Sequence, residues 1–329
     1  MNLLEIKNLQ MDFGAGAGAA RAIDGVSLAI DVGETVCLVG ESGCGKSVTA
    51  QSIARLVPVP PANYVGGEIL LNGRDTLKMS PRELRGIRGG VVSYVFQEPG
   101  AALNPVFRIG AQIKESLKLH RPEKANNAEV MRLLKLVGIP APESRINNYP
   151  FEMSGGMQQR VMIAMALASE PKLLVADEPT TALDVTIQAE VVAILDRLRR
   201  DRGIGMLFIT HDLDLAAAIC DRTVVMYAGQ IAEVRASELL HSDPLHPYTA
   251  ALAGARPEIE QKASRLHAIP GRPLSAFEAP PGECAFAPRC PHAQPFCRAG
   301  VPELTELDGG LSRCVRAGEL RGHLEAAHG

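Results

Sequence analysis

The segment GESGCGKS, residues 40–47, constrains the fold of this 329-residue chain more than any other part of its sequence. It fits the pattern G-x-x-x-x-G-K-[ST], follows the continuous apolar run TVCLVG (35–40), and precedes a helix expected over 45–57. In such a strand–loop–helix unit, glycines let successive backbone N–H groups point at phosphate oxygens, and the helix N-terminus adds partial positive charge. The segment therefore predicts an α/β domain with a phosphate-binding loop.

Within this loop, Lys46 is expected to reach the β- and γ-phosphates of a nucleotide, and the Ser47 hydroxyl to ligate Mg²⁺. We interpret Cys44 as a tolerated small side chain rather than a nucleophile, because the loop acts through its backbone. A glycine-rich turn with an incidental lysine is the alternative, and the strand–helix context argues against it. The residues expected to bind nucleotide here are Gly40, Glu41, Ser42, Gly43, Cys44, Gly45, Lys46, Ser47 and Val48.

The first two thirds of the chain alternate β-type runs with helical patterns, which is typical of an α/β sheet. Between about residues 98 and 160 the β-character disappears, and a helical subdomain is expected there. After about residue 236 the composition shifts toward Pro, His and Cys, so we expect two domains, 1–235 and 236–329. Further strands are expected at 3–9, 21–30, 66–73, 91–97, 172–179, 205–212 and 222–234, and helices at 129–139 and 185–201.

Polar side chains follow three of these expected strands. Asp177 and Glu178 end one strand, where a magnesium-binding carboxylate and a general base for water would fit. His211 and Gln97 end two others, and ligands of open α/β sheets bind at such carboxyl ends. His211 is a candidate γ-phosphate sensor, whereas Gln97 would carry no weight on its own. Without the phosphate loop, the adjacent acids would be read as a solvated turn.

Charge and hydropathy limit the class of protein. The formal net charge is −3 and the pI about 6.3, so no overall basic field attracts nucleic acid. The N-terminal residues lack a basic segment followed by an apolar core, and no run approaches the roughly 18 apolar residues of a membrane span. These features predict a cytosolic protein, in which stable disulfides are rare.

The segment SGGMQQR (154–160) completes a series of motifs. With it the chain resembles the ATP-binding subunit of an ABC transporter, specifically of the peptide-importer branch, over essentially its whole length. HPYTAAL (246–252) and the cysteine-containing tail resemble the peptide/nickel importer group in particular. In chain order the six motifs are GESGCGKS, VFQEP, MSGGMQQR, VADEP, TALD and ITHD.

The resemblance implies a P-loop nucleotide-binding domain that hydrolyses ATP with Mg²⁺, held by Ser47, Gln97 and Asp177. It also implies a head-to-tail dimer with a second ABC ATPase, a paralogue or a copy of itself, because one chain carries one phosphate loop and one signature. Ser154, Gly155 and Gly156 would then face the γ-phosphate held by the partner, and Asp184 would lie at the interface.

Further implications concern the base and the membrane. Phe13 is the nearest candidate for stacking on adenine, although GAGAGAA (14–20) lengthens the segment after it. The helical subdomain would dock on membrane permease subunits, which cooperate with a substrate-binding protein. The expected location is therefore peripheral, on the cytoplasmic face of the membrane.

The motifs admit several candidate functions. The first is the ATPase of an importer of dipeptides or oligopeptides; nickel chelates or glutathione-like compounds are alternative substrates with the same motifs. An ABC protein acting on DNA or the ribosome would normally fuse two cassettes or carry basic extensions, and this chain has neither. A P-loop kinase or GTPase would lack SGGMQQR, and a dead cassette would not retain Lys46, Asp177, Glu178 and His211.

Four of the seven cysteines lie near the end of the chain, at positions 284, 290, 297 and 314. Their spacing matches no C-x-x-C zinc ribbon, and from the residues alone a structural metal, a redox pair and chance remain open. Four thiolates suit either tetrahedral Zn²⁺ or a [4Fe–4S] cluster, and His292 could replace one ligand. The resemblance favours the cluster on Cys284, Cys290, Cys297 and Cys314, since several peptide-importer ATPases hold one there, with zinc as runner-up.

Overall fold

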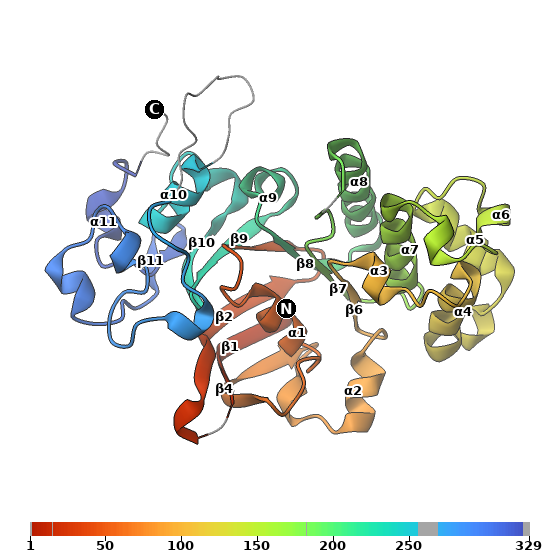
Figure 1. Cartoon of the computed structure of the whole chain (residues 1–329), viewed down its shortest axis with the longest axis horizontal. Coiled ribbons are helices and arrows are strands. Elements are labelled where there is room, and N and C mark those ends of the chain that lie inside the picture. Colours follow the sequence, from red (N-terminus) through yellow and green to blue (C-terminus); the bar gives the residue numbers. More distant parts are fainter. Residues whose placement is uncertain (1, 15, 182, 256–268, 325–329) are drawn as a thin grey trace. The chain divides into compact units, whose positions relative to one another are not determined.

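The computed structural model describes residues 2–14, 16–181, 183–255 and 269–324 (Figure 1). These residues form two compact units. The first consists mainly of Asp75–Ile209 together with Ile30–Thr35. The second contains Leu4–Ala29, Val36–Arg74 and the described residues from Thr210 onward. The boundary expected near residue 236, between domains 1–235 and 236–329, stays a prediction.

The first unit is built on three parallel strands. β7 (Leu173–Asp177) pairs with β6 (Val92–Val95) on one side and with β8 (Gly205–Thr210) on the other. Every residue of β7 and β8 is buried. This burial on both faces explains why LLVAD and GMLFIT are nearly continuous apolar runs rather than alternating ones.

Helices fill the region predicted to be a helical subdomain (Figure 1). α7 (Gly155–Leu167) packs against α3 (Pro99–Ala102), α4 (Ile109–His120) and α5 (Asn127–Leu136). Helix α7 is apolar around most of its circumference because it is surrounded by other elements, so VMIAMALA forms a buried helix as expected. The short helix α6 (Pro142–Arg145) packs on α5.

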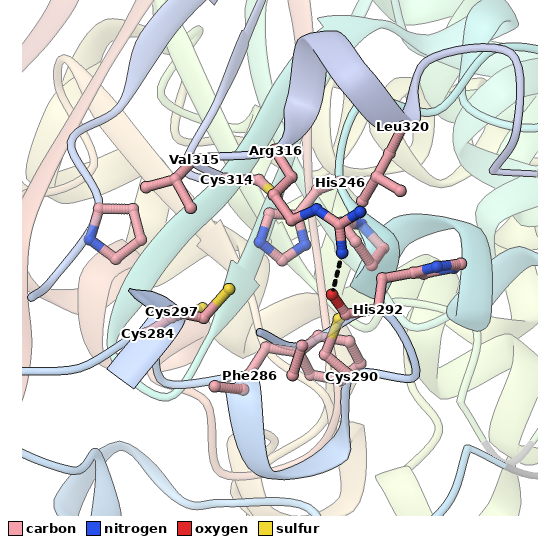
Figure 2. Close-up of a pocket in the computed structure, with 14 residues that line it drawn as sticks. His246, Cys284, Phe286, Cys290, His292, Cys297, Cys314, Val315, Arg316 and Leu320 are labelled. Carbon is pink, nitrogen blue, oxygen red and sulfur yellow. Dashed lines mark hydrogen bonds between the residues drawn. The ribbon is translucent and has the colours of Figure 1, made fainter. Parts of the chain in front are cut away.

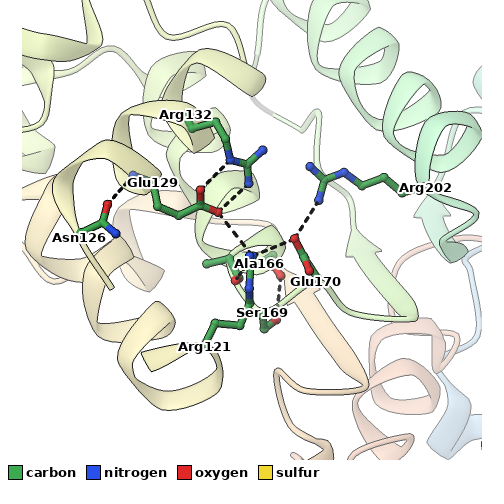
Figure 3. A network of polar contacts seen from close by, with 9 residues as sticks. Arg121, Asn126, Glu129, Arg132, Ala166, Ser169, Glu170 and Arg202 are labelled. Atoms are coloured by element: carbon green, nitrogen blue, oxygen red, sulfur yellow. Dashed lines mark hydrogen bonds and ion pairs between the residues drawn. The ribbon is translucent and has the colours of Figure 1, made fainter. Parts of the chain in front are cut away.

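A polar network ties these helices together (Figure 3). Arg121 follows α4, and its side chain is only 10% exposed. Its Nη1 lies 2.9 Å from Glu170 Oε1, 3.5 Å from Glu129 Oε1 on α5, and 3.4 Å from the Ala168 carbonyl oxygen at the end of α7. Arg132 pairs with both carboxylate oxygens of Glu129, each at 2.7 Å. One buried guanidinium therefore joins the ends of three helices.

Helices α8 (Val185–Arg202) and α2 (Pro81–Ile87) complete the regular structure of the first unit. α8 begins at the N-cap Asp184 and ends at Gly203, whose φ of 62° is the left-handed conformation common after helices. In α2, Ser80 and Glu83 form a reciprocal capping box.

The second unit contains a four-stranded sheet of order β2-β1-β4-β5. In it β1 pairs antiparallel with β4, from Leu4 opposite Leu71 to Phe13 opposite Ala62. The bounds are β1 (Asn2–Phe13), β2 (Ala20–Asp31), β4 (Ala62–Leu71) and β5 (Arg74–Asp75).

A second group of strands in this unit positions the phosphate loop. β3 (Thr35–Val39) pairs in parallel with β9 (Arg222–Tyr227), and β9 pairs antiparallel with β10 (Gln230–Ala236). The hairpin of β11 (Thr305–Leu307) and β12 (Gly310–Ser312) joins the outer edge of β10. The helices of this unit are α1 (Lys46–Ser52), α9 (Leu213–Ile219), α10 (Pro247–Gly254) and α11 (Ala317–Leu320).

The strands expected over 3–9 and 66–73 are longer in the structure, as β1 and β4, and two other predicted elements differ more. The strand expected over 222–234 is a hairpin, because Ala228 and Gly229 adopt positive φ values of 46° and 82° and reverse the chain between β9 and β10. The helix expected over 45–57 ends at Ser52, since Arg55 adopts a left-handed φ of 51°. The α/β class with an inserted helical region is confirmed. No helix among the described residues has the length and hydropathy needed to cross a membrane.

Candidate functional site

The phosphate loop connects β3 to α1 and depends on its glycines. Gly40 has a φ of 153°, and a Cβ atom there would lie 2.3 Å from the Met226 carbonyl oxygen. Gly45 has a φ of 105° immediately before the first residue of α1. The loop passes so close to the end of β9 that no larger residue fits at Gly40, and it leads directly into the helix.

Lys46 is the first residue of α1, and only 6% of its surface is exposed. Its Nζ donates to the carbonyl oxygens of Gly40 at 2.7 Å and Glu41 at 3.1 Å. The ammonium group is therefore held inside the loop, where an anion bound to the loop would meet it. Cys44 is buried in the same loop, and burial raises the pKa of its thiol, which disfavours a nucleophilic thiolate. Ser47 and Val48 follow on the first turn of α1, both half-buried.

The two adjacent acids lie at the end of β7 in the first unit. Asp177 is 7% exposed and Glu178 half-buried. Glu178 has a φ of 45°, and its N–H donates to the Ile209 carbonyl oxygen at 3.0 Å. Its Oε2 accepts hydrogen bonds from Gln97 Nε2 at 3.1 Å and from the Thr181 hydroxyl at 2.8 Å. Thus Gln97 and Glu178, 81 residues apart, meet as their positions at strand ends predict.

Thr181 was not singled out from the sequence, although it belongs to the quoted TALD motif, whose Ala182 lies outside the described residues. The signal that could have identified it is its position three residues after Glu178 in a tight turn, where its N–H also donates to the Glu178 carbonyl oxygen at 3.2 Å.

His211 directly follows β8, and its side chain is exposed. The next residue, Asp212, caps α9 by accepting from the N–H groups of Asp214 at 2.9 Å and Leu215 at 3.2 Å. His211 is therefore placed between a strand end and a capped helix, as the ITHD motif predicts. It belongs to the second unit, whereas Asp177, Glu178 and Gln97 belong to the first.

The signature segment opens α7. Ser154 is the N-cap, and its hydroxyl accepts from the Met157 N–H at 3.4 Å. Ser154 and Gly155 are exposed, so the positive end of this 13-residue helix is accessible to an anion. Gly156 is buried, and a Cβ atom there would lie 2.5 Å from Ile187 of α8. Asp184, also exposed, caps α8 by accepting from the Ile187 N–H at 2.9 Å.

Phe13, the candidate for stacking on adenine, ends β1 and is half-buried. Its ring meets that of Phe277 edge to face, with centroids 5.7 Å apart. Phe277 comes from the short 3₁₀ turn Ala276–Glu278 near the C-terminal cysteines and is 52% exposed. Sequence reasoning had no signal for this second ring.

The four C-terminal cysteines line one pocket (Figure 2). Cys284 and Cys297 lie side by side, with the Cys284 N–H donating to the Cys297 carbonyl oxygen at 3.0 Å, and Cys290 and Cys314 lie on other walls. All four are free thiols, so the pocket is not a disulfide staple. His292 also lines it.

Burial raises the pKa values of the Cys284, Cys290 and Cys314 thiols, that of Cys314 to about 11. These groups therefore carry their protons at neutral pH unless a metal displaces them. Across the described ranges of the chain, no three His, Cys, Asp or Glu side chains stand close enough together to hold one metal ion. The donor type fits a metal centre, but the present spacing does not fit a single zinc ion.

Comparison with known proteins supplies independent information. The family model of ABC transporters matches residues 23–181, and that of the oligopeptide/dipeptide transporter C-terminal region matches residues 232–297. The chain is 45% identical to the dipeptide transport ATP-binding protein DppD of Bacillus subtilis, over 92% of this chain and 91% of that protein. It is 43% identical to DppD of Escherichia coli, over 95% of this chain and 96% of that protein.

Solved structures agree with this similarity. The dimeric ATP-binding cassette MJ0796, in a post-hydrolysis state with ADP and Pi bound, matches with a TM-score of 0.63 and 28% identity, over 71% of this chain and 98% of that one. The cassette cbiO1 of Clostridium perfringens matches with a TM-score of 0.62 and 26% identity, over 72% of this chain and 89% of that one.

Proposed function

The chain belongs to the ABC transporter family, and from that premise we propose that it is the ATP-hydrolysing subunit that powers uptake of dipeptides or oligopeptides through a membrane permease. The observation that carries this proposal is the likeness to peptide-transport ATP-binding proteins over nearly the full length, including the C-terminal region. Nickel chelates and glutathione-like compounds are the alternative substrates.

In the proposed reaction, Lys46 and the backbone of the phosphate loop bind the β- and γ-phosphates, and Ser47 and Asp177 hold Mg²⁺. Glu178 accepts a proton from the attacking water, while Gln97 contacts Mg²⁺ and His211 senses the γ-phosphate. The buried ammonium group of Lys46 and the hydrogen bond between Gln97 and Glu178 support these roles.

The proposed active form is a head-to-tail dimer with a second ABC ATPase. The accessible N-terminus of α7, with Ser154, Gly155 and Gly156, binds the γ-phosphate held by the partner, and Asp184 lies at the interface. The helical region docks on permease subunits at the cytoplasmic face of the membrane, and a substrate-binding protein delivers the peptide.

The Glu178→Gln variant tests the ATPase mechanism. We expect ATP turnover to fall by about two orders of magnitude or more, the contribution typical of a positioned general base, while ATP binding remains. Glu115→Gln, an exposed residue on α4, is the matched control and should retain turnover. Unchanged turnover in Glu178→Gln would mean that the assigned mechanism is wrong.

Uptake tests the substrate. The protein is reconstituted in liposomes with its permease, its partner ATPase and the substrate-binding protein, and ATP-dependent accumulation is measured for dipeptides, longer peptides, a nickel chelate and glutathione. Accumulation of peptides alone supports the proposal. Accumulation of nickel chelate or glutathione without peptide would assign one of the alternatives instead.

The cysteine pocket is proposed to hold a structural [4Fe–4S] cluster on Cys284, Cys290, Cys297 and Cys314. Support comes from four free thiols around one pocket, since Cys thiolates are the ligands that hold iron–sulfur clusters. The cluster would supply cross-links to a Pro-rich segment with few regular elements.

Anaerobically purified protein should be brown and contain iron and sulfide, and Cys290→Ser should lose both, whereas Cys220→Ser should not. Colourless, iron-free protein would overturn this proposal, and bound zinc would identify the runner-up.

A further inference from the structure

The second residue of the phosphate loop is held by side chains from the C-terminal part of the same unit. The Glu41 N–H donates to the Tyr248 hydroxyl oxygen at 2.9 Å. Both oxygens of its carboxylate accept from Arg289, Oε2 from Nη1 at 2.6 Å and Oε1 from Nη2 at 3.1 Å. Such a two-pronged guanidinium–carboxylate pair fixes orientation as well as distance.

Arg289 is itself firmly held. Its side chain is only 4% exposed, and its Nε donates to the Pro270 carbonyl oxygen at 2.8 Å. Its guanidinium carbon lies 5.8 Å from the centroid of the Tyr227 ring, and Nη1 is 3.4 Å from the Tyr227 hydroxyl. These contacts restrict the rotamers of Arg289 far more than those of an exposed arginine. The pair with Arg289 therefore also restricts the position of the Glu41 carboxylate.

Two more contacts extend the attachment along the loop. The Ala276 N–H donates to the Gly43 carbonyl oxygen at 3.0 Å. Tyr248 is fully buried against Tyr227 and Phe286, with ring centroids 4.7 and 5.3 Å away. The loop is therefore fastened at two points outside the strand–loop–helix unit, at residue 41 to Tyr248 and Arg289 and at residue 43 to the backbone of Ala276.

The charge of Glu41 makes this attachment matter for nucleotide binding. A carboxylate on a loop that binds phosphates would repel them, because like charges in a partly buried site interact strongly. Arg289 supplies the opposite charge. In addition, the Glu41 carbonyl oxygen accepts from Lys46 Nζ at 3.1 Å, so the position of Glu41 also affects the phosphate-binding lysine.

We propose that Arg289 is a positioning residue for ATP binding, which neutralises Glu41 and, with Tyr248 and the Ala276 N–H, holds the phosphate loop in its binding shape. The C-terminal region thereby has a direct part in the nucleotide site. This inference rests on the proposed ATP-binding function and adds to it a role for residues outside the six motifs.

The experiment measures the Kd of ATP by titration calorimetry and the KM and kcat of ATP hydrolysis for Arg289→Met, Glu41→Gln and the double variant. Arg289→Met should raise Kd and KM about tenfold or more, with a smaller change in kcat, because the phosphate loop would then carry an uncompensated carboxylate. Adding Glu41→Gln should restore most of the affinity, since it removes the repelling charge. Arg321→Met, an exposed arginine of the same region, is the matched control.

The outcomes separate the inference from the function on which it rests. A wild-type protein that fails to bind ATP would remove the proposed function itself. If wild type binds ATP and folded Arg289→Met binds it equally well, the inference is wrong. It is also wrong if the double variant binds as weakly as Arg289→Met, because the pair would then act through structure alone. Should Arg289→Met fail to fold, Glu41→Gln decides: tighter ATP binding supports charge neutralisation, and equal or weaker binding contradicts it.

Discussion

The carboxylate of Glu178 is held from two sides on a strained backbone. A φ of 45° is uncommon for a residue with a side chain and costs about 1 kcal/mol or more. The surrounding turn compensates, with hydrogen bonds from Thr181 to both the carboxylate and the carbonyl group of Glu178. This conformation places one carboxylate oxygen of Glu178, Oε2, against Gln97 and Thr181. A fixed orientation of the carboxylate is consistent with the role proposed for Glu178.

Thr181→Val tests that orientation. The change removes the hydroxyl but keeps the side-chain volume, and we expect kcat for ATP hydrolysis to fall about tenfold, since a hydrogen bond to a charged group contributes roughly 1.5 kcal/mol. KM for ATP should stay the same because Thr181 contacts Glu178. Thr181→Ser retains the hydroxyl and serves as control. Equal kcat values for the Val and Ser variants would exclude this positioning role.

Among the elements, the helices α4, α5 and α7 depend on one guanidinium at their ends (Figure 3). Arg121→Met should lower the free energy of unfolding by about 2 kcal/mol, since it removes at once the contacts of a nearly buried guanidinium with Glu129, Glu170 and the Ala168 carbonyl oxygen. Arg132→Met removes a more exposed partner of the same Glu129 and should cost less than about 1 kcal/mol. Urea denaturation of both variants measures the difference, and equal losses would contradict it.

Elements with strong patterns were predictable, and those shaped by distant contacts were not. The buried strands β7 and β8 and the helices α5 and α8 lie where apolar periodicity predicts them. The turn at Ala228–Gly229 was missed because apolar residues continue on both sides of it. The hairpin β11–β12 is too short to show a pattern and forms because β10 offers it an edge.

Over the whole molecule, contacts between distant parts of the chain were beyond sequence reasoning. The candidate residues of the phosphate loop and of the strand ends could be named from motifs, because their chemistry is local. The pairing of Glu41 with Arg289 joins residues 248 positions apart, and no spacing rule connects them. The four cysteines could be predicted as a group from the sequence. Phe286 and Arg289 lie between two of them, and their contacts with Tyr227 and with Glu41 of the phosphate loop could not be predicted.

Stability should respond to pH through Glu233, which is fully buried and accepts from the N–H groups of Leu245 and His246 at 3.0 and 2.9 Å. Burial raises the pKa of its carboxyl group from 4.5 to about 7. The pKa of Glu233 is thus higher in the folded protein than in the unfolded chain, so the protonated carboxyl group contributes to the free energy of unfolding. This contribution is complete below pH 4.5 and is lost as the pH rises to 7. The loss is on the order of 3 kcal/mol.

Glu233→Gln stays neutral at every pH and therefore lacks this loss. Between pH 5 and 8, the unfolding free energy of the wild type should decline relative to that of the variant. Chemical denaturation at several pH values measures both curves. Parallel curves would mean that Glu233 is ionised in the folded protein throughout this range.

The last prediction links the cysteine pocket to the phosphate loop. Cys284 and Cys290 enclose the turn that carries Phe286 and Arg289, with the Ala287 N–H donating to the Cys284 carbonyl oxygen and the Cys290 N–H to that of Ala287. Fixing both cysteines to one centre would therefore hold Arg289 against Glu41. Cys290→Ser should raise the Kd of ATP about threefold, a smaller effect than losing Arg289 itself, because the hydrogen bonds of the turn remain.

If the proposed cluster is present, removing its iron from wild-type protein with a chelator should raise the Kd by a similar factor and leave Cys290→Ser unaffected. Cys220→Ser, which alters a buried cysteine that does not line this pocket, should bind ATP like the wild type. Titration calorimetry on the wild type and Cys290→Ser, each with and without chelator, and on Cys220→Ser gives the comparison. If Cys290→Ser binds ATP as tightly as the wild type, the pocket and the phosphate loop are independent, and Arg289 is held by Pro270 and Tyr227 alone.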